Sequence, residues 1–103
     1  GSATQYFTGV FDGTRFTPDD PRTTQWLDYG PDNYAGVTWS GAPDDRKIFL
    51  GWMSNWAYAE VVPTEKWRSA MTLPRDISLK RSGKRLYARS TLSPEVLTIA
   101  SEK

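Results

Sequence analysis

The residues most able to form a site in this chain are its tryptophans, three of which fall within one stretch. Residues 51–75 hold Trp52, Trp56 and Trp67 together with Asn55. A tryptophan buries apolar C–H surface against its face and donates a hydrogen bond from its edge. Side chains of this kind are typical of sugar-binding sites and of protein interfaces. This stretch is therefore the candidate functional segment, and the rest of the chain must position it.

Cysteine and histidine are both absent from the 103 residues. Their absence excludes disulfides, thiolate nucleophiles, zinc–thiolate sites, Ser-His-Asp triads and imidazole bases from this chain. Acid–base chemistry would have to come from Asp, Glu, Lys or Tyr. The net charge of +1 favours neither nucleic acid nor an anionic membrane, and no apolar run is long enough to span a bilayer. We expect neither as a partner.

Four strands in succession are predicted in the second part of the chain, with turns between them. They cover residues 34–40, 47–53, 67–73 continued by 77–80 with a break at Pro74, and 85–92. The first two read as buried strands of a hairpin, and the last as an outer strand with one solvated face. The small residues Ala35 and Gly36 predict the close approach of another backbone.

A further hairpin is predicted at the start of the chain. Residues 4–11 are rich in aromatic and β-branched side chains and read as one strand, and residues 14–17 read as its partner. Asp12-Gly13 between them is a strong hairpin signal, because glycine tolerates the positive φ of a type I′ turn.

The end of the chain is open to two interpretations. Ser93 and Pro94 could start a short helix, with Ser93 as N-cap and Pro94 at the first helical position, or the segment could connect to another domain. The four predicted strands form a meander of the size of one propeller blade. Because a single blade cannot bury both of its faces, the chain reads as part of a larger assembly.

Several motifs occur in a fixed order along the chain. They are Trp26-Leu27-Asp28-Tyr29-Gly30, Asp32-Asn33-Tyr34-Ala35, Gly51-Trp52-Met53-Ser54-Asn55-Trp56, Pro63-Thr64 and the run from Trp67 to Arg75. Over residues 4–92 the sequence resembles glycoside hydrolase family 32, which contains the invertases, inulinases and levanases. The resemblance implies an all-β fold: an antiparallel four-stranded blade plus a preceding hairpin, as a fragment of a five-bladed β-propeller.

The resemblance also implies an activity and a domain organisation. The activity is hydrolysis of terminal β-fructofuranosyl units with retention, by an Asp nucleophile and a Glu acid/base. The expected organisation is a hairpin of the preceding blade (1–25), the final blade (26–92) and a connector (93–103) towards a β-sandwich. The remainder of the propeller is then the expected partner, and secretion is expected from the family.

The catalytic motifs of that family are missing from this sequence. No Asn-Asp-Pro-Asn-like, Arg-Asp-Pro or Glu-Cys motif is present, and Asp20-Pro21 follows Asp19 rather than an arginine. We therefore expect no catalytic residue here and no fructose release by the chain alone. The alternatives are a non-catalytic carbohydrate-binding module and a structural fragment that needs a complementary chain.

Four residues are the expected contacts to a β-fructoside. The resemblance implies that Trp56 forms an apolar wall of the pocket, and the alternative is packing between blades. Asn55 could bind sugar hydroxyls or cap the backbone of a turn. Asp32 and Tyr34 stand at the entry to the innermost strand, where propellers build pockets, although Asp32 could simply form the turn. Trp52 is interpreted as a core residue.

The charged clusters are interpreted as structural. The acidic pairs Asp19-Asp20 and Asp44-Asp45 read as turns rather than as a calcium site, so no metal and no cofactor is expected. The basic residues between positions 75 and 89 are interpreted as protection of an exposed outer strand and not as a nucleic-acid surface.

Overall fold

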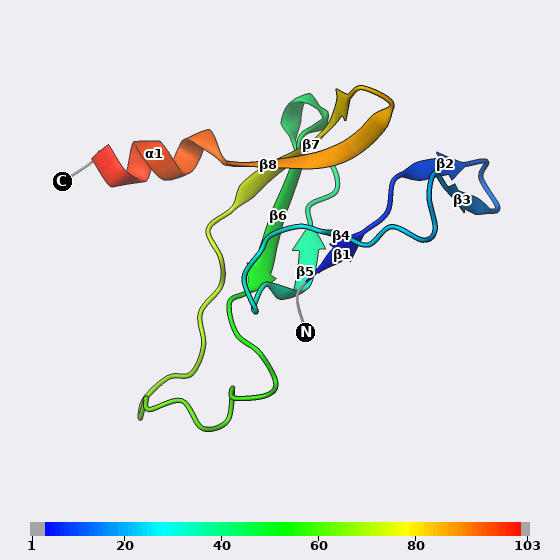
Figure 1. Ribbon diagram of the computed structural model, residues 1–103. Helices are drawn as coiled ribbons and strands as arrows, with labels where there is room; N and C mark the ends of the chain where they lie inside the picture. Colours follow the sequence, from blue (N-terminus) through cyan, green and yellow to red (C-terminus); the bar gives the residue numbers. More distant parts are fainter. Residues whose placement is uncertain (1–3, 102–103) are drawn as a thin grey trace.

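The computed structural model describes residues 4–101 as an antiparallel sheet from which a hairpin and a helix project in opposite directions (Figure 1). The elements are β1 (Gln5–Tyr6), β2 (Gly9–Phe11), β3 (Phe16–Pro18), β4 (Gln25–Trp26), β5 (Tyr34–Thr38), the short 3₁₀-helix η1 (Pro43–Asp45), β6 (Lys47–Trp52), β7 (Arg75–Ser82), β8 (Arg85–Leu92) and α1 (Pro94–Ser101).

The main sheet has four strands in the order β5-β6-β7-β8, and every neighbouring pair is antiparallel. This arrangement confirms the predicted meander. Strands β7 and β8 pair along their whole length, from Arg75 opposite Leu92 to Ser82 opposite Arg85. The tight turn between them contains Gly83, whose φ of 61° lies in the left-handed region that glycine adopts without strain.

The connection from β6 to β7 is a long irregular loop, residues 53–74, as predicted for its first part. Its last residues return to the sheet, because Met71 forms a bridge with Trp52 and the Thr72 N–H donates to the Gly51 carbonyl at 2.8 Å. Pro74 lacks an N–H and separates this bridge from β7. Strand β7 thus begins directly after Pro74, but the strand predicted over residues 67–73 is absent, and Met71 forms only an isolated bridge.

Strand β5 differs from the prediction of a buried strand, because all five of its residues are exposed. It lies at the edge of the sheet, so its apolar residues have a neighbour on one side only. Gly36 does meet a close neighbour, but this is a side chain and not a backbone: a Cβ there would lie 2.0 Å from the Phe49 ring. The ring of the buried Phe49 thus occupies the space above Gly36.

The predicted first strand, residues 4–11, is instead two strands that pair with different partners. Strand β1 pairs with β4 and β2 pairs with β3, so the chain changes direction at Phe7 and Thr8. The β2–β3 hairpin is confirmed, but its loop is not the expected type I′ turn. Four residues connect the strands, and the Asp12 carboxylate accepts the N–H groups of Thr14 and Arg15 at 2.8 and 2.7 Å.

The free edge of β8 is covered by two side chains from the β1–β4 ribbon. The Ala88 N–H donates to the Tyr6 hydroxyl at 3.1 Å, and the Gln25 amide donates to the Leu86 carbonyl at 3.4 Å. An unpaired strand edge invites pairing with another chain. These two contacts therefore block part of the edge, in addition to the basic residues that the sequence suggested for this role.

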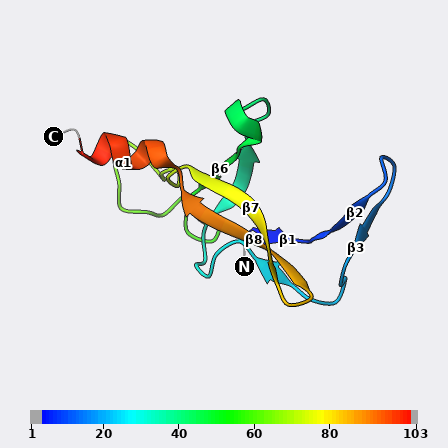
Figure 2. The same cartoon turned by 90° about the horizontal axis from the view of Figure 1, so that it is seen from above.

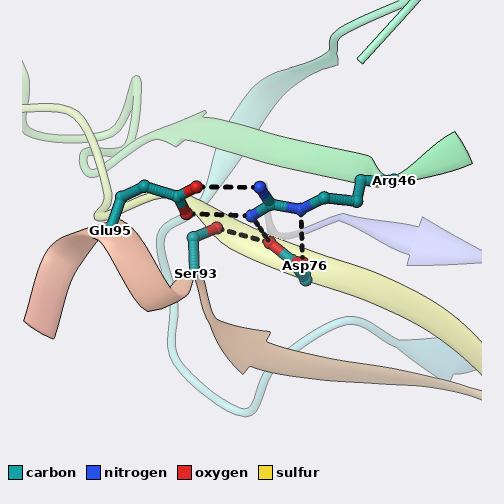
Figure 3. A network of polar contacts seen from close by, with 4 residues as sticks. All are labelled: Arg46, Asp76, Ser93 and Glu95. Carbon is teal, nitrogen blue, oxygen red and sulfur yellow. Dashed lines mark hydrogen bonds and ion pairs between the residues drawn. The ribbon is translucent and has the colours of Figure 1, made fainter. Parts of the chain in front are cut away.

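Helix α1 follows β8 directly and is tied to the sheet by Arg46. The guanidinium donates to both carboxylate oxygens of Asp76, at 2.9 and 3.0 Å, and to both of Glu95, at 2.8 and 2.9 Å (Figure 3). The Ser93 hydroxyl also donates to Asp76, at 2.6 Å. The helical interpretation of this segment is therefore correct, and the predicted N-cap residue bonds to β7.

Little of the described chain is buried. Among residues 4–101 the buried apolar side chains are Phe49 and Ala59, and the radius of gyration is 16.2 Å. A compact domain of this length has a radius of about 13 Å. Figure 2 shows the reason: the β2–β3 hairpin and α1 both extend beyond the sheet, on opposite sides. The predicted division between residues 25 and 26 falls within β4 and stays a prediction.

Candidate functional site

The four predicted contact residues lie at one end of the sheet. Tyr34 begins β5, and Asp32 belongs to the turn that precedes it. Asn55 and Trp56 belong to the loop 53–74, which leaves the adjacent strand at the same end. Because Tyr34 pairs with Trp52, the last residue of β6, the antiparallel pairing brings the turn and the loop together.

Three aromatic rings form a row across this end of the sheet. The ring centroids of Tyr34 and Trp52 are 6.2 Å apart, and those of Trp52 and Trp56 are 5.2 Å apart in an edge-to-face arrangement. Trp52 is half-buried between its two neighbours, whereas Trp56 is 65% exposed. The row thus presents an indole to solvent, a surface suited to the apolar C–H face of a ligand.

A β-bulge aims Tyr34 at this row. Tyr34 pairs with Trp52 and Val37 pairs with Leu50, so β5 has one extra residue between these pairs. Ala35 lies within the bulge and has a φ of 53°, which is rare for a residue other than glycine. Bulges of this kind redirect side chains and are frequent next to functional sites.

Two hydrogen bonds, which we call the loop-to-turn bonds, join the loop 53–74 to the turn before β5. The Tyr58 hydroxyl donates to the Asp32 carboxylate, and the Asn55 amide donates to the Pro31 carbonyl at 3.0 Å. The Asn55 Oδ1 also accepts the Ala57 N–H at 2.9 Å. Asn55 therefore stabilises the local backbone, as the alternative interpretation of this residue expects.

The carboxylates of the site are engaged as hydrogen-bond acceptors. Asp28 accepts the Gly30 N–H at 2.9 Å and the Asn33 amide at 2.7 Å, and Asp32 accepts Tyr58. The bond to Asp32, together with burial and the negative charge of that carboxylate, raises the pKa of the Tyr58 phenol. The bond to Asp32 therefore favours the neutral form of the Tyr58 phenol, which donates the hydrogen bond.

A shallow hollow of about 200 Å³ lies beside the turn. Its lining residues are Asp28, Gly30, Pro31, Asp32, Asn33, Met53 and Thr72. Complete pockets for small ligands are larger, on the order of 300–1,000 Å³. By itself this hollow is therefore smaller than an ordinary small-ligand pocket.

Acidic clusters able to hold a metal ion and helices able to span a membrane are both absent from residues 4–101. Within that range no group of three or more Asp or Glu residues could hold a metal ion. The Asp20 carboxylate instead accepts the Thr23 hydroxyl at 2.6 Å and the Arg22 N–H at 3.0 Å. No helix in the described part of the chain is long and apolar enough to cross a membrane.

Two residues of the site were not singled out from the sequence. Tyr58 follows Trp56 by two positions and offers an aromatic ring with a polar end, which was a usable signal. Asn33 is buried and left-handed, with a φ of 74°. Asparagine tolerates this conformation better than most residues, but the sequence does not show which partners its amide meets.

Comparison with known proteins identifies the family. The sequence profile described as "Glycosyl hydrolases family 32 N-terminal domain" matches residues 1–90. The chain is 54% identical to the levanase of Bacillus subtilis over 83 residues, which are 78% of this chain and 12% of the levanase. It is 47% identical to the extracellular exo-inulinase of Aspergillus awamori over 89 residues, which are 81% of this chain and 17% of that enzyme.

Solved structures of such enzymes have the same fold. The exo-inulinase of Aspergillus awamori superposes with a TM-score of 0.78 at 43% identity, over 86% of this chain and 18% of that one. The fructofuranosidase of Schwanniomyces occidentalis complexed with fructose gives 0.76 at 38% identity, over 92% of this chain and 20% of that one. Both have a β-propeller N-terminal domain, which confirms the predicted fold class. The chain belongs to glycoside hydrolase family 32.

Proposed function

We propose that this chain supplies one wall of a β-fructoside-binding site in a propeller-type glycoside hydrolase, without the catalytic carboxylates. The observation that carries the proposal is the exposed indole of Trp56 at the end of the aromatic row, beside the polar turn. An apolar face next to hydroxyl, amide and carboxylate groups matches the surface of a sugar. Relatives are named levanase, exo-inulinase and invertase, and one relative was solved with fructose.

The remaining parts of the site would come from other propeller blades. The chain spans 12–17% of the length of two curated relatives, and the hollow at the turn is smaller than an ordinary ligand pocket. Retaining hydrolysis needs two carboxyl groups about 5–5.5 Å apart on either side of the scissile bond. Here the carboxylates of Asp28 and Asp32 both accept hydrogen bonds from neighbouring groups of the chain. The proposed division is residues 1–25 in the preceding blade, 26–92 in the final blade and 93–103 as a connector.

The substrate class follows from the relatives, which act on levan, inulin and sucrose between them. We extend to this chain the terminal β-fructofuranosyl unit that these substrates share. Several relatives are named extracellular, so we place the function outside the cell.

A chimera tests the proposal. The matching segment of the Bacillus subtilis levanase is replaced by this chain, and fructose release from levan, inulin and sucrose is measured. We expect the chimera to be active and the isolated chain to release no fructose. Release by the isolated chain would show that its own carboxylates perform the chemistry and would overturn the proposal.

The contribution of the aromatic wall is tested in the same chimera. Trp56→Ala removes an apolar contact of a kind worth about 1.5–3 kcal/mol, so kcat/KM should fall about 10- to 100-fold. Trp39→Ala is the matched control, because Trp39 is 48% exposed and follows the opposite end of β5. Equal losses in the two variants, at equal stability, would argue that Trp56 has no specific contact with the sugar.

A further inference from the structure

Asn33 is the last residue of the turn before β5 and lies between Asp32 and Tyr34, two of the candidate contact residues. It is 7% exposed, and its backbone is left-handed. Its N–H donates to the Trp52 carbonyl at 3.1 Å, and its carbonyl accepts the Thr4 hydroxyl at 2.6 Å. The backbone of Asn33 therefore links the turn to β6 and to the segment before β1.

The side chain of Asn33 closes a hydrogen-bonded ring within the turn. Its Nδ2 donates to Oδ2 of Asp28 at 2.7 Å, while Oδ1 of Asp28 accepts the Gly30 N–H at 2.9 Å. The orientation of the amide is set by this partner, because a flipped amide would place two acceptor oxygens against each other. Asp28, Gly30 and Asn33 thus hold the turn in one conformation.

The oxygen end of the Asn33 amide lies in an unfavourable environment. The Asn33 Oδ1 is buried and has no hydrogen-bond partner within residues 4–101. It lies so close to Gly51 that a Cβ there would be 1.9 Å away. A buried acceptor without a donor is unfavourable, and the only compensation from Gly51 is a weak contact with its Cα hydrogens. The Asn33 amide is present although its buried oxygen is unfavourable. This indicates that the amide is needed to fix the geometry of the turn.

We propose that Asn33 is a positioning residue of the candidate site: it holds the turn so that both loop-to-turn bonds can form, and these place the loop that carries Trp56. The turn supplies the acceptors, on Asp32 and Pro31, and the loop supplies the donors. The identity of the ligand depends on the proposed function, whereas the geometry of the turn does not depend on it.

The state of the Tyr58 phenol reports on the turn without any substrate. The bond to Asp32 raises the pKa of Tyr58, so loss of the turn geometry should lower that pKa toward its ordinary value of about 10. The measurement is titration of the full chain labelled with ¹³Cζ-tyrosine, followed by NMR. It is run in about 1 M salt, where the Debye length is about 3 Å, so that changes in distant charge are screened.

Asn33→Gly is the first variant, because glycine keeps the left-handed backbone and removes only the amide. We expect the pKa of Tyr58 to fall in this variant and also in Asp32→Asn, which removes the acceptor charge. Asp12→Gly is the control, since it removes a similar turn-stabilising carboxylate in the β2–β3 hairpin. A folded Asn33→Gly variant in which the Tyr58 pKa is unchanged would refute the positioning role.

A swap of donor and acceptor supplies the second test and applies even where Asn33→Gly does not fold. Asp28→Asn alone leaves one acceptor oxygen for two donors, the Gly30 N–H and the Asn33 amide, so it breaks the ring and should lower the pKa of Tyr58. Asp28→Asn combined with Asn33→Asp restores one amide and one carboxylate and leaves the net charge unchanged, so the raised pKa should return. Failure of a folded double variant to restore it would overturn the inference.

The proposed function and the positioning role of Asn33 are refuted by different experimental outcomes. In the levanase chimera, Asn33→Gly should lower kcat/KM about tenfold, the equivalent of one ordinary hydrogen bond, and the swap should restore it. If the chimera is inactive, but the pKa of Tyr58 falls in Asn33→Gly and returns in the donor–acceptor swap, the proposed function alone is refuted. An active chimera whose kcat/KM is the same with and without Asn33→Gly would refute the positioning role alone.

Discussion

At the scale of single residues, Gly36 shows how one absent methyl group determines the packing of the sheet. The Phe49 ring lies over Gly36 and is buried there, in a chain with few buried side chains. Because β5 is an edge strand, this contact adds to the backbone pairing that attaches it to β6. The attachment matters for the site, since Tyr34 belongs to β5.

Replacing Gly36 by alanine should therefore destabilise the fold. The new Cβ would lie 2.0 Å from the ring, which forces Phe49 or β5 to move. Overpacking of this kind costs about 1–3 kcal/mol, which urea unfolding measures. Gly30→Ala is the control, because its nearest neighbour is 3.6 Å away and its φ is not left-handed. Equal stability of the two variants would contradict the packing account.

At the scale of elements, Arg46 determines how α1 is attached to the sheet. Its two bidentate contacts reach Asp76 on β7 and Glu95 in the first turn of the helix (Figure 3). The guanidinium lowers the pKa of both carboxyl groups, and that of Glu95 falls to about 2. The helix extends away from the sheet, so these contacts replace a packed interface.

This network predicts a specific loss of stability in acid. Groups whose pKa is lower in the folded chain stabilise it fully above their unfolded values and lose that contribution as pH falls through the folded values. Stability should therefore decline from about pH 4.5 towards pH 2, as Glu95 and Asp76 take up protons. Urea unfolding at pH 7, 4 and 2.5 measures the decline.

The control for acid stability is a second carboxylate. Glu95→Gln should flatten the pH dependence, whereas Glu65→Gln, at an exposed position in the loop 53–74, should leave it unchanged. Because Glu95 is 63% exposed, salt should weaken the effect. A profile that is the same in both variants would show that Arg46 does not couple α1 to the sheet.

How well each element could be predicted depends on where its contacts lie. The bounds of β8 follow from the alternation of apolar and polar residues, which reports directly on a half-solvated strand. The apolar run of β5 predicted burial, but this strand lies at the edge of the sheet, where β6 is its one neighbour among the described residues. The break at Pro74 was predictable because it has a purely local cause.

The candidate site shows the same limit. Trp56 and Asn55 could be identified from the sequence as candidate contact residues, because they fall in one stretch rich in aromatic residues. The bond from Tyr58 to Asp32 joins two irregular segments that lie 26 positions apart, and no periodic pattern encodes it. The orphaned oxygen of Asn33 likewise depends on the backbone of Gly51, so it becomes visible only in three dimensions.

At the scale of the whole molecule, the described chain leaves large apolar side chains open to solvent. On the β2–β3 hairpin these are Val10, Phe11 and Phe16, just before it lies Phe7, and on α1 they are Leu97 and Ile99. A two-stranded hairpin is marginal by itself and needs a packed face to be stable. In a complete propeller, neighbouring blades would cover such faces, which agrees with the proposed role as one wall of a larger site.

The exposed hairpin face should bind a hydrophobic dye when the chain is alone. Phe11→Ser together with Phe16→Ser should reduce the fluorescence of bound 8-anilinonaphthalene-1-sulfonate and change the urea midpoint little, because neither ring is buried. The same two substitutions in the levanase chimera should lower its stability, since the hairpin would there pack against a neighbouring blade. Substitutions that lower stability equally in the chain and in the chimera would mean that the hairpin supports this chain alone, and the case for a missing neighbour at this face would be lost.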